Sequence, residues 1–314
     1  MARILDSVLG HEQIIEKILE SFEMGRPGQT NLFVGPSGIG KKKVAMGLAQ
    51  ALLCTESKRA CGRCPSCFRM SAGSHEGFML VEPSGAQIKM DQAKEVIEFL
   101  SFKSISGNRV IIIDQAQNLN PQAANSLLKT LEEPPPGTFF YLIAPSVSGL
   151  MSTIRSRSKV VQFRPLSAEL LAKKVQAPTW ALRSAGGSFE KLEQLQEGPE
   201  QELRKKSAEI LQLFLRDDDF LLSEAWRSEF KDRSQAQRLM SYWVSYAKDA
   251  IYLQEEMKTQ IQNLDMVNLI KYLAEFEREF LLSLAQKSLE AERAFLAHRD
   301  AQLVMEELFV TIRR

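Results

Sequence analysis

Apolar residues follow two different patterns along the first half of the chain. Short continuous apolar runs predict buried strands at residues 31–34, 79–81, 110–114, 139–143 and 160–163. Apolar residues spaced three and four apart predict helices between them, at 12–24, 43–53, 91–103 and 123–131. Strands that are apolar on both faces and alternate with helices indicate a parallel sheet with helices on both sides. We therefore predict an α/β fold.

The helix predicted at 91–103 should turn Val96, Ile97, Phe99 and Leu100 inward. After Arg164-Pro165-Leu166 the strand pattern ends, short helices follow around Gly186-Gly187, and the chain from about residue 203 is helical throughout. Within 266–284 an apolar stripe runs through Leu269, Leu273, Phe276, Phe280 and Leu284. Such a stripe is most often core, and subunit contact is the minority interpretation. The pattern divides the chain into 1–165, a small helical domain at 166–205, and an all-α domain at 206–314.

Composition narrows the class of protein without identifying a partner. Apolar residues make up 44% of the chain and charged residues 25%, which is typical of globular domains. The net charge of +1 gives no overall attraction to nucleic acid or membrane. No apolar run approaches the roughly 18 residues of a membrane span, and the first residues lack the basic-then-apolar order of a secretion signal. We expect a cytoplasmic location.

A glycine-rich loop lies between the first predicted strand and the helix that follows it. Gly35, Gly38, Gly40 and Lys41 match the phosphate-binding pattern G-x-x-x-x-G-K-[ST] in its proper strand–loop–helix context. The last position is Lys42, where the pattern has the hydroxyl that holds the magnesium ion of a bound nucleotide. Lys41, Lys42 and Lys43 could still attract phosphate, although solvated charges on the helix face explain two of the three equally well.

The strand at 110–114 ends on Asp114, in the place of the acidic residue that organises magnesium in such sites. The next residue is Gln115, where an Asp-Glu pair would supply the catalytic base. Glutamine orients water but does not accept a proton at neutral pH. We therefore expect no ATP hydrolysis by this chain alone, and ATP with Mg²⁺ is a doubtful ligand of its own site.

All four cysteines fall in one short segment, at Cys54, Cys61, Cys64 and Cys67. In a reducing cytosol, clustered cysteines indicate a metal site rather than disulfides. Four thiolates with two C-x2-C steps suit tetrahedral zinc, while an iron–sulfur cluster and free buried cysteines are the competing interpretations. Because four protein ligands leave no position for water, such a zinc ion would be structural.

Longer motifs carry a family resemblance over residues 1–165. Asn125-Ser-Leu-Leu-Lys-Thr-Leu-Glu-Glu-Pro-Pro135 and Thr153-Ile-Arg-Ser-Arg-Ser158 resemble motifs of the bacterial DNA polymerase III clamp-loader subunits, in the AAA+ superfamily. Val8-Leu9-Gly10-His11 resembles the start of the same domain, and the cysteines after the loop helix also fit. The resemblance implies an AAA+ P-loop domain at 1–165 with a zinc-binding insertion at 54–67, a lid at 166–205, and a collar at 206–314 that holds a pentamer.

Within that family the chain resembles the delta-prime branch more than the ATPase motor branch, gamma/tau. Lys42 and Gln115 depart from the motor pattern, Glu190 stands where motors have the arginine of Gly-Ser-x-Arg, and Pro145 stands near a threonine-containing sensor. The chain also stops at 314, without the long tail of tau. Ser158 replaces the cysteine of the family's Ser-Arg-Cys motif, where we expect a packing role.

The resemblance implies a subunit of the polymerase holoenzyme that works inside an open ring of five. Arg157 is expected to act as an arginine finger in trans on ATP held by an adjacent motor subunit, where such a group contributes about 10³–10⁵ in rate. An ion pair with a local carboxylate is the competing explanation, and Arg155 is the less favoured finger. The implied partners are gamma/tau, delta, the sliding clamp, and primer-template DNA through the assembled ring.

Three other functions stay open at this point. The chain could be an active motor subunit, or a sensor that binds ATP without cleaving it. A zinc-knuckle nucleic-acid protein is more remote, because no basic or aromatic cluster surrounds the cysteines. Lys103 and Arg109 are candidate exposed contacts to DNA, although simple solvated charges explain both.

Overall fold

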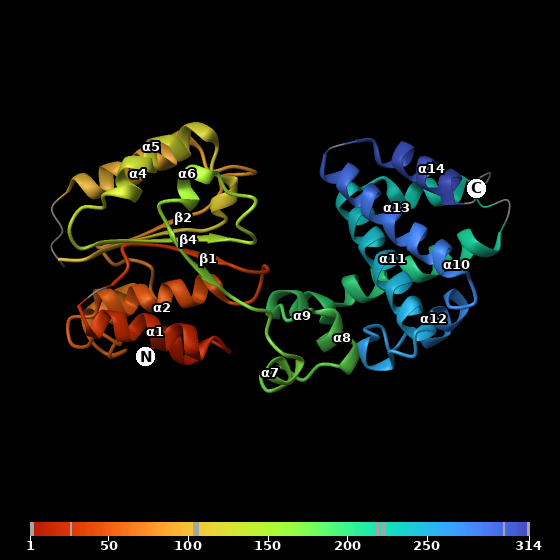
Figure 1. Ribbon diagram of the computed structural model, residues 1–314, viewed down its shortest axis with the longest axis horizontal. Coiled ribbons are helices and arrows are strands. Elements are labelled where there is room, and N and C mark those ends of the chain that lie inside the picture. The colour runs from red at the N-terminus through yellow and green to blue at the C-terminus, as the bar shows by residue number, and fades with distance from the viewer. Residues whose placement is uncertain are drawn as a thin grey trace. The chain divides into compact units, whose positions relative to one another are not determined.

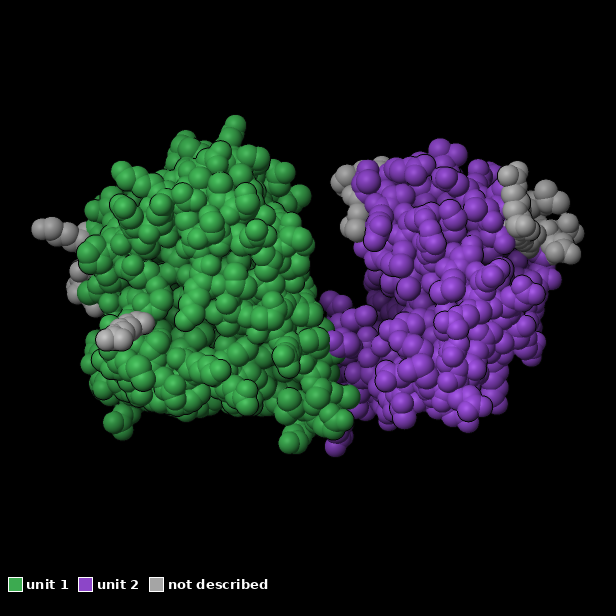
Figure 2. All heavy atoms as spheres, in the orientation of Figure 1, with its two compact units in different colours: residues 1–174, 187–190 green, residues 175–186, 191–314 purple. Residues whose placement is uncertain are grey.

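The computed structural model describes residues 3–25, 27–102, 107–217, 220, 224–297 and 299–312. The chain forms two compact units, shown in different colours in Figure 2. Unit 1 comprises residues 1–174 and 187–190, and unit 2 comprises 175–186 and 191–314. The finer division into three domains, with boundaries at 165 and 205, stays a prediction.

Unit 1 is built on a five-stranded parallel sheet in the order β2-β3-β4-β1-β5. The strands are β1 (Thr30–Val34), β2 (Phe78–Val81), β3 (Arg109–Ile113), β4 (Thr138–Ala144) and β5 (Lys159–Gln162). The apolar runs of the sequence thus form strands where they were predicted. Because strands alternate their faces, Val110 and Ile112 enter one core layer and Ile111 and Ile113 the other.

Helices cover both faces of this sheet, as Figure 1 shows. On one side lie α1 (Glu12–Glu23) and α2 (Lys41–Leu53), and on the other α4 (Met90–Ser101) and α5 (Pro121–Glu132). The shorter elements of this unit are η1 (Ile4–Ser7), α3 (Pro65–Ser71), η2 (Ala116–Asn118), α6 (Ser152–Arg155) and α7 (Ala168–Ala172). Asn120 begins α5 by accepting a hydrogen bond from the Ala123 N–H, with Pro121 at the first helical position.

The predicted inward face of α4 is wrong at one position. Val96 and Leu100 are buried and Phe99 packs partly against the core, but Ile97 is 40% exposed. Val96 and Leu100 lie four residues apart on one helix face, and Ile97 is rotated by about 100° from Val96, toward solvent. An isolated apolar residue at the edge of a buried stripe cannot be placed from spacing alone.

Unit 2 is helical, as the sequence predicted. Its elements are α8 (Thr179–Ser184), α9 (Phe189–Gln196, whose first two residues belong to unit 1), α10 (Gly198–Arg216), η3 (Glu224–Phe230), α11 (Arg233–Gln254), η4 (Lys258–Gln260), α12 (Val267–Leu273), α13 (Arg278–Leu296) and α14 (Ala301–Ile312). Helices α11 and α13 pack along one another. Phe309 lies at the centre of an aromatic core with Phe214, Trp226, Phe230 and Trp243.

The apolar stripe predicted over 266–284 is divided between two helices. Helix α12 ends at Leu273 and α13 begins at Arg278, so the stripe is not one continuous helix face. Leu273 and Leu284 are fully buried, and Phe276 in the connection stacks on Phe280 with ring centroids 4.8 Å apart. The stripe is therefore largely core, which was the favoured interpretation.

The buried side chain of Arg204 joins residues 175–186 to the long helices of unit 2. Arg204 on α10 is 2% exposed, and its guanidinium lies 4.2 Å from the centre of the Trp180 ring on α8. It also forms a bidentate ion pair with Asp265. Arg183 on α8 donates to the Ile261 carbonyl over 2.8 Å. These contacts tie the short helix to the bundle through side chains far apart in sequence.

Candidate functional site

The predicted phosphate-binding loop joins β1 to α2 and has the backbone of such a loop. Gly38 and Gly40 have φ of +72° and +97°, values that favour glycine. The Lys41 ammonium is buried and donates to the carbonyls of Gly35 and Pro36, both over 2.6 Å. Burial lowers the pKa of Lys41, and the nearby charge of Asp114 opposes that shift. The loop and the amino end of α2 therefore form a cradle suited to an anion.

The side of the loop that would hold magnesium contains a lysine and two carboxylates. Lys42 Nζ lies 3.4 Å from Asp114 Oδ2 and 2.5 Å from Glu82 Oε1. The second oxygen of Asp114, Oδ1, accepts a hydrogen bond from the Gln115 N–H over 3.0 Å. Gln115 itself is exposed and accepts a hydrogen bond from Asn118. A donor set with an ammonium at position 42 does not fit a magnesium ion, because an ammonium has no lone pair to offer.

The segment at 187–190 packs directly against the loop. The Phe189 N–H donates to the Gly38 carbonyl over 2.9 Å. A Cβ on Gly38 would lie 2.1 Å from Ser188 Oγ and 2.8 Å from Glu190 Cβ, so only glycine allows this approach. Glu190 thus places a carboxylate beside the loop, where its negative charge would repel a phosphate.

Sequence reasoning missed two residues that this site uses. His11 has a left-handed backbone, and its Nε2 lies 2.9 Å from the Ile39 carbonyl, so its ring contacts the backbone of the loop. Only the resemblance of Val8-Leu9-Gly10-His11 pointed to this segment. Glu82, the second partner of Lys42, follows β2 directly. Glu82 could have been found in the same way as Asp114, because each is an acidic residue directly after a predicted parallel strand.

Arg157 is ordered on the surface of unit 1 by a local carboxylate. Its Nε donates to Glu132 Oε2 over 2.7 Å, and Nη1 donates to the Thr153 carbonyl over 3.1 Å. The Arg157 side chain is 29% exposed and that of Glu132 is 56% exposed. The local ion pair that was weighed against the finger is therefore present. A pair this exposed stabilises the fold by only about 0–1 kcal/mol, so a stronger anion can displace Glu132.

The four cysteines converge as the spacing predicted. Their Sγ atoms all lie within 4.8 Å of one another, and the pairs Cys54–Cys64 and Cys61–Cys67 are each 3.9 Å apart. Sulfurs at about 2.3 Å from a tetrahedral zinc ion stand about 3.8 Å apart, so the cluster fits one such ion at its centre. Burial alone would raise the pKa of Cys64, but hydrogen bonds led by that from the Cys67 N–H bring it to about 6.

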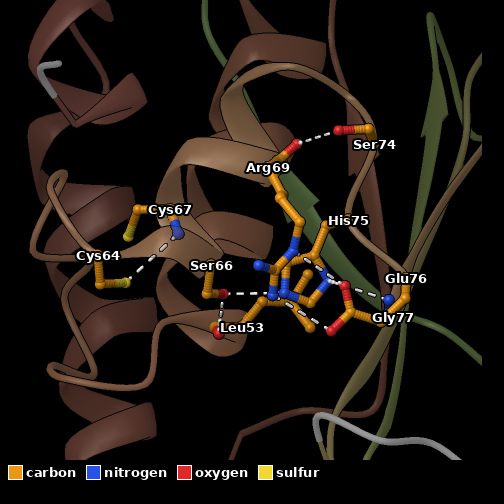
Figure 3. A network of polar contacts seen from close by, with 9 residues as sticks. All are labelled: Leu53, Cys64, Ser66, Cys67, Arg69, Ser74, His75, Glu76 and Gly77. Atoms are coloured by element: carbon orange, nitrogen blue, oxygen red, sulfur yellow. Dashed lines mark hydrogen bonds and ion pairs between the residues drawn. The ribbon is translucent and has the colours of Figure 1, made fainter.

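A buried histidine, His75, connects the cysteine-bearing segment 54–67, here called the knuckle, to the sheet, as Figure 3 shows. The Gly77 N–H donates to His75 Nδ1 over 2.9 Å, so the proton of the neutral ring lies on Nε2 and is donated to Ser66 Oγ, also over 2.9 Å. Ser66 in turn donates to the Leu53 carbonyl. Burial lowers the pKa of His75, which favours the neutral ring that this chain of hydrogen bonds requires.

The two candidate DNA contacts gain no support. Lys103 lies outside the described residues. Arg109 is half-buried rather than exposed, and its Nη1 donates to the carbonyls of Leu100 and Phe102 over 2.6 and 2.8 Å. Its charge meets the carbonyls at the end of α4, which is a structural role.

Among the described residues no helix is long and apolar enough to cross a membrane.

Comparisons with known proteins agree with these motifs. The family model described as DNA polymerase III, delta subunit matches residues 10–167, half of the chain. DNA polymerase III subunit delta' of Haemophilus influenzae is 33% identical over 197 residues, which are 59% of this chain and 60% of that protein. Subunit delta' of Bacillus subtilis is 26% identical over 313 residues, or 96% of this chain and 95% of that protein. The alignment thus spans about three fifths of the Haemophilus relative.

Among solved structures, a clamp-loader-related protein resembles most of the chain. A DNA polymerase III gamma subunit-related protein from Thermotoga maritima aligns with a TM-score of 0.52 and 16% identity, over 94% of this chain and 98% of that one. At this identity the likeness concerns the fold alone. It agrees with the predicted fold, a parallel α/β domain followed by helices.

Proposed function

Because the chain belongs to the DNA polymerase III delta subunit family, in its delta-prime branch, we propose that it is a catalytically silent clamp-loader subunit that completes the active site of a neighbour. In this role Arg157 is the arginine finger for ATP held by an adjacent gamma/tau motor subunit. The chain's own loop supplies structure and no hydrolysis. The assembly acts in the cytoplasm, loading the sliding clamp onto primer-template DNA together with delta.

One contrast carries this proposal. The loop at 35–41 keeps its backbone and Lys41, yet Lys42 and Gln115 replace the groups that would hold magnesium and activate water. Arg157, by comparison, has what a finger requires: its guanidinium is oriented by Glu132, and its side chain reaches solvent. A loop that lacks the groups for metal binding and water activation, together with an oriented arginine that reaches solvent, supports action in trans.

The physics of the finger follows from its environment. A guanidinium stays charged at any physiological pH and meets phosphate oxygens with two parallel donors. Nη1 is anchored on the Thr153 carbonyl, so the group is oriented before it meets a neighbour. A γ-phosphate that develops charge attracts the guanidinium more strongly than the exposed Glu132 does, so the arginine changes partner when the neighbour's ATP reaches it.

The cysteine cluster supports a structural role for a metal. Cys54, Cys61, Cys64 and Cys67 would hold zinc as a cross-link between the end of α2 and the helix α3. When bound, zinc neutralises thiolates and fixes the loop that they span; four protein ligands leave no position for catalysis. His75 and Ser66 hold the same segment from the sheet side.

The experiment is an Arg157→Ala substitution in a reconstituted loader, with hydrolysis followed in a single turnover. The finger predicts a loss of about 10³-fold or more at the site that Arg157 faces, with the other motor sites unaffected. Arg155→Ala is the matched control, because Arg155 is exposed two residues away. Unchanged DNA-stimulated hydrolysis and clamp loading by Arg157→Ala would refute the proposal. Steady turnover by the isolated chain would identify it as a motor instead.

A further inference from the structure

Two positions fix where a magnesium ion lies in a phosphate-binding loop. One is the hydroxyl directly after the loop lysine, and the other is the aspartate at the end of a neighbouring strand. Here these positions are Lys42 and Asp114. The fold brings them together as it would in an active site, since β1 leads into the loop and β3 ends at Ile113. The place of the ion is therefore defined by this chain's own backbone.

The cation that meets Asp114 at this position is the Lys42 ammonium. It lies 3.4 Å from Asp114 Oδ2, within ion-pair distance of the group that would ligate the ion. It also contacts Glu82, which is brought beside Asp114 because Val81 and Ile113 are partners in the parallel ladder of β2 and β3. Two carboxylates from adjacent strand ends thus converge on one tethered cation. The other oxygen of Asp114 already accepts the Gln115 N–H.

Charge and chemistry both oppose a metal here. Burial alone would lower the pKa of Lys42, but the hydrogen bond with Glu82 and the charge of Asp114 outweigh it and the pKa is raised. Lys42 therefore stays protonated and offers donors only, while Mg²⁺ requires oxygen lone pairs in octahedral geometry. An ammonium so close to Asp114 also repels a divalent ion directly.

We propose that Lys42 is a built-in replacement for the magnesium ion, so that this loop does not take up a divalent metal with a nucleotide. Position 42 thereby changes from a metal ligand to the cation itself. The inference deepens the proposed function. It rests on one part of that function, the absence of ATP hydrolysis at the chain's own loop. Hydrolysis would then fail before the missing base at Gln115 matters, because without a metal ion the phosphates are not held for attack by water.

The test uses Mn²⁺ as a paramagnetic substitute for Mg²⁺, since both prefer oxygen ligands. MnCl₂ is titrated with ADP into the full chain, and free Mn²⁺ is followed by electron paramagnetic resonance against an ADP-only baseline. Wild type should take up no Mn²⁺ beyond that baseline. Lys42→Ser, which restores the hydroxyl, should bind Mn²⁺ with ADP at least tenfold more tightly. Adding Asp114→Asn to that variant should abolish the gain.

Lys43→Ser is the matched control, because it removes one positive charge from the exposed face of the same helix and should behave as wild type. Lys42→Thr repeats the test with a second hydroxyl, and far-ultraviolet circular dichroism verifies the fold of each variant. The proposal is overturned if wild type takes up Mn²⁺ with ADP and loses it on Asp114→Asn, or if neither folded hydroxyl variant gains uptake. Neither result depends on Arg157 in the ring, so this inference and the finger fail separately.

Discussion

Arg157 Nε donates to Glu132 Oε2 over 2.7 Å, which joins the two motifs on which the family resemblance rests. Glu132 closes α5 within the Leu-Glu-Glu-Pro-Pro motif, and Arg157 follows α6 within Thr-Ile-Arg-Ser-Arg-Ser. The two residues are 25 positions apart in sequence. A carboxylate from one motif thus orients the arginine of the other, which makes Glu132 a positioning residue in the proposed function.

Glu132→Gln should therefore impair catalysis in trans without unfolding the chain. The exposed pair stabilises the fold by about 0–1 kcal/mol, so the unfolding transition should hardly move. The guanidinium loses its partner but keeps its charge, so single-turnover hydrolysis at the facing site should fall far less than the roughly 10³-fold expected for Arg157→Ala. Glu133→Gln, on the exposed neighbour, is the control. Equal losses in both glutamine variants would argue against positioning by Glu132.

Metal content is the second prediction. The purified chain should hold one zinc ion per molecule by elemental analysis, and no absorption from iron–sulfur charge transfer should appear. Cys67→Ser should lose the ion, because three thiolates bind zinc far more weakly than four. Ser71→Ala, on the same helix and outside the cluster, should retain it. Full metal content in Cys67→Ser would show that the cluster is not the site.

The placement of the tryptophans allows damage to be assigned to one unit. All three, Trp180, Trp226 and Trp243, belong to unit 2. Their fluorescence therefore reports on unit 2, whereas far-ultraviolet circular dichroism reports on both units. Chelation of zinc should lower the midpoint of the unfolding transition followed by circular dichroism, because the cysteines lie in unit 1. The midpoint followed by tryptophan fluorescence should not change. Movement of both transitions would mean that the metal stabilises more than its own unit.

The histidine behind the knuckle should be important for stability. His75→Ala leaves the Gly77 N–H without its acceptor and removes the ring between Ser66 and the backbone, which should cost about 1–3 kcal/mol in the free energy of unfolding. The loss should appear in circular dichroism and not in tryptophan fluorescence. Glu76→Gln weakens an exposed pair with Arg69 and a 3.7 Å contact with His75 Nδ1 but keeps the ring, so it should cost less than about 1 kcal/mol. Similar losses in the two variants would refute the role of the buried chain.

The proposed collar should depend on apolar side chains that unit 2 leaves exposed. Leu282 and Leu289 lie seven residues apart on one face of α13 and are 50% and 41% exposed. Replacing both with glutamate should abolish co-purification with the motor subunit, as deletion of 206–314 would, while the tryptophan transition stays unchanged. Lys271→Glu, an exposed charge change on α12, should leave assembly intact. Normal assembly by the double variant would exclude this face.

Much of the fold could be predicted because its signals are local. Buried parallel strands are apolar on both faces, so the runs at 110–114 and 139–143 needed no partner to be recognised. The loop glycines and the cysteine spacing are likewise short-range patterns, and the structure places both groups as expected. Ile97 and the division of the stripe at Leu273 were wrong or incomplete, because spacing gives a face and not the position of its edge or the end of a helix.

The order of residues alone establishes which chemical groups are present and absent: the loop lysine without its hydroxyl, the aspartate without its glutamate, four clustered thiols and the Ser-Arg pair. The partners of those groups become known only when the chain is folded. Lys42 meets Asp114 and Glu82, Glu190 lies beside Gly38, and Arg157 meets Glu132, across separations of 25 to 152 residues that no local pattern encodes. Ion pairs and close backbone approach depend on distance in space, and for Glu82 and Asp114 that distance follows from the pairing of β2 with β3.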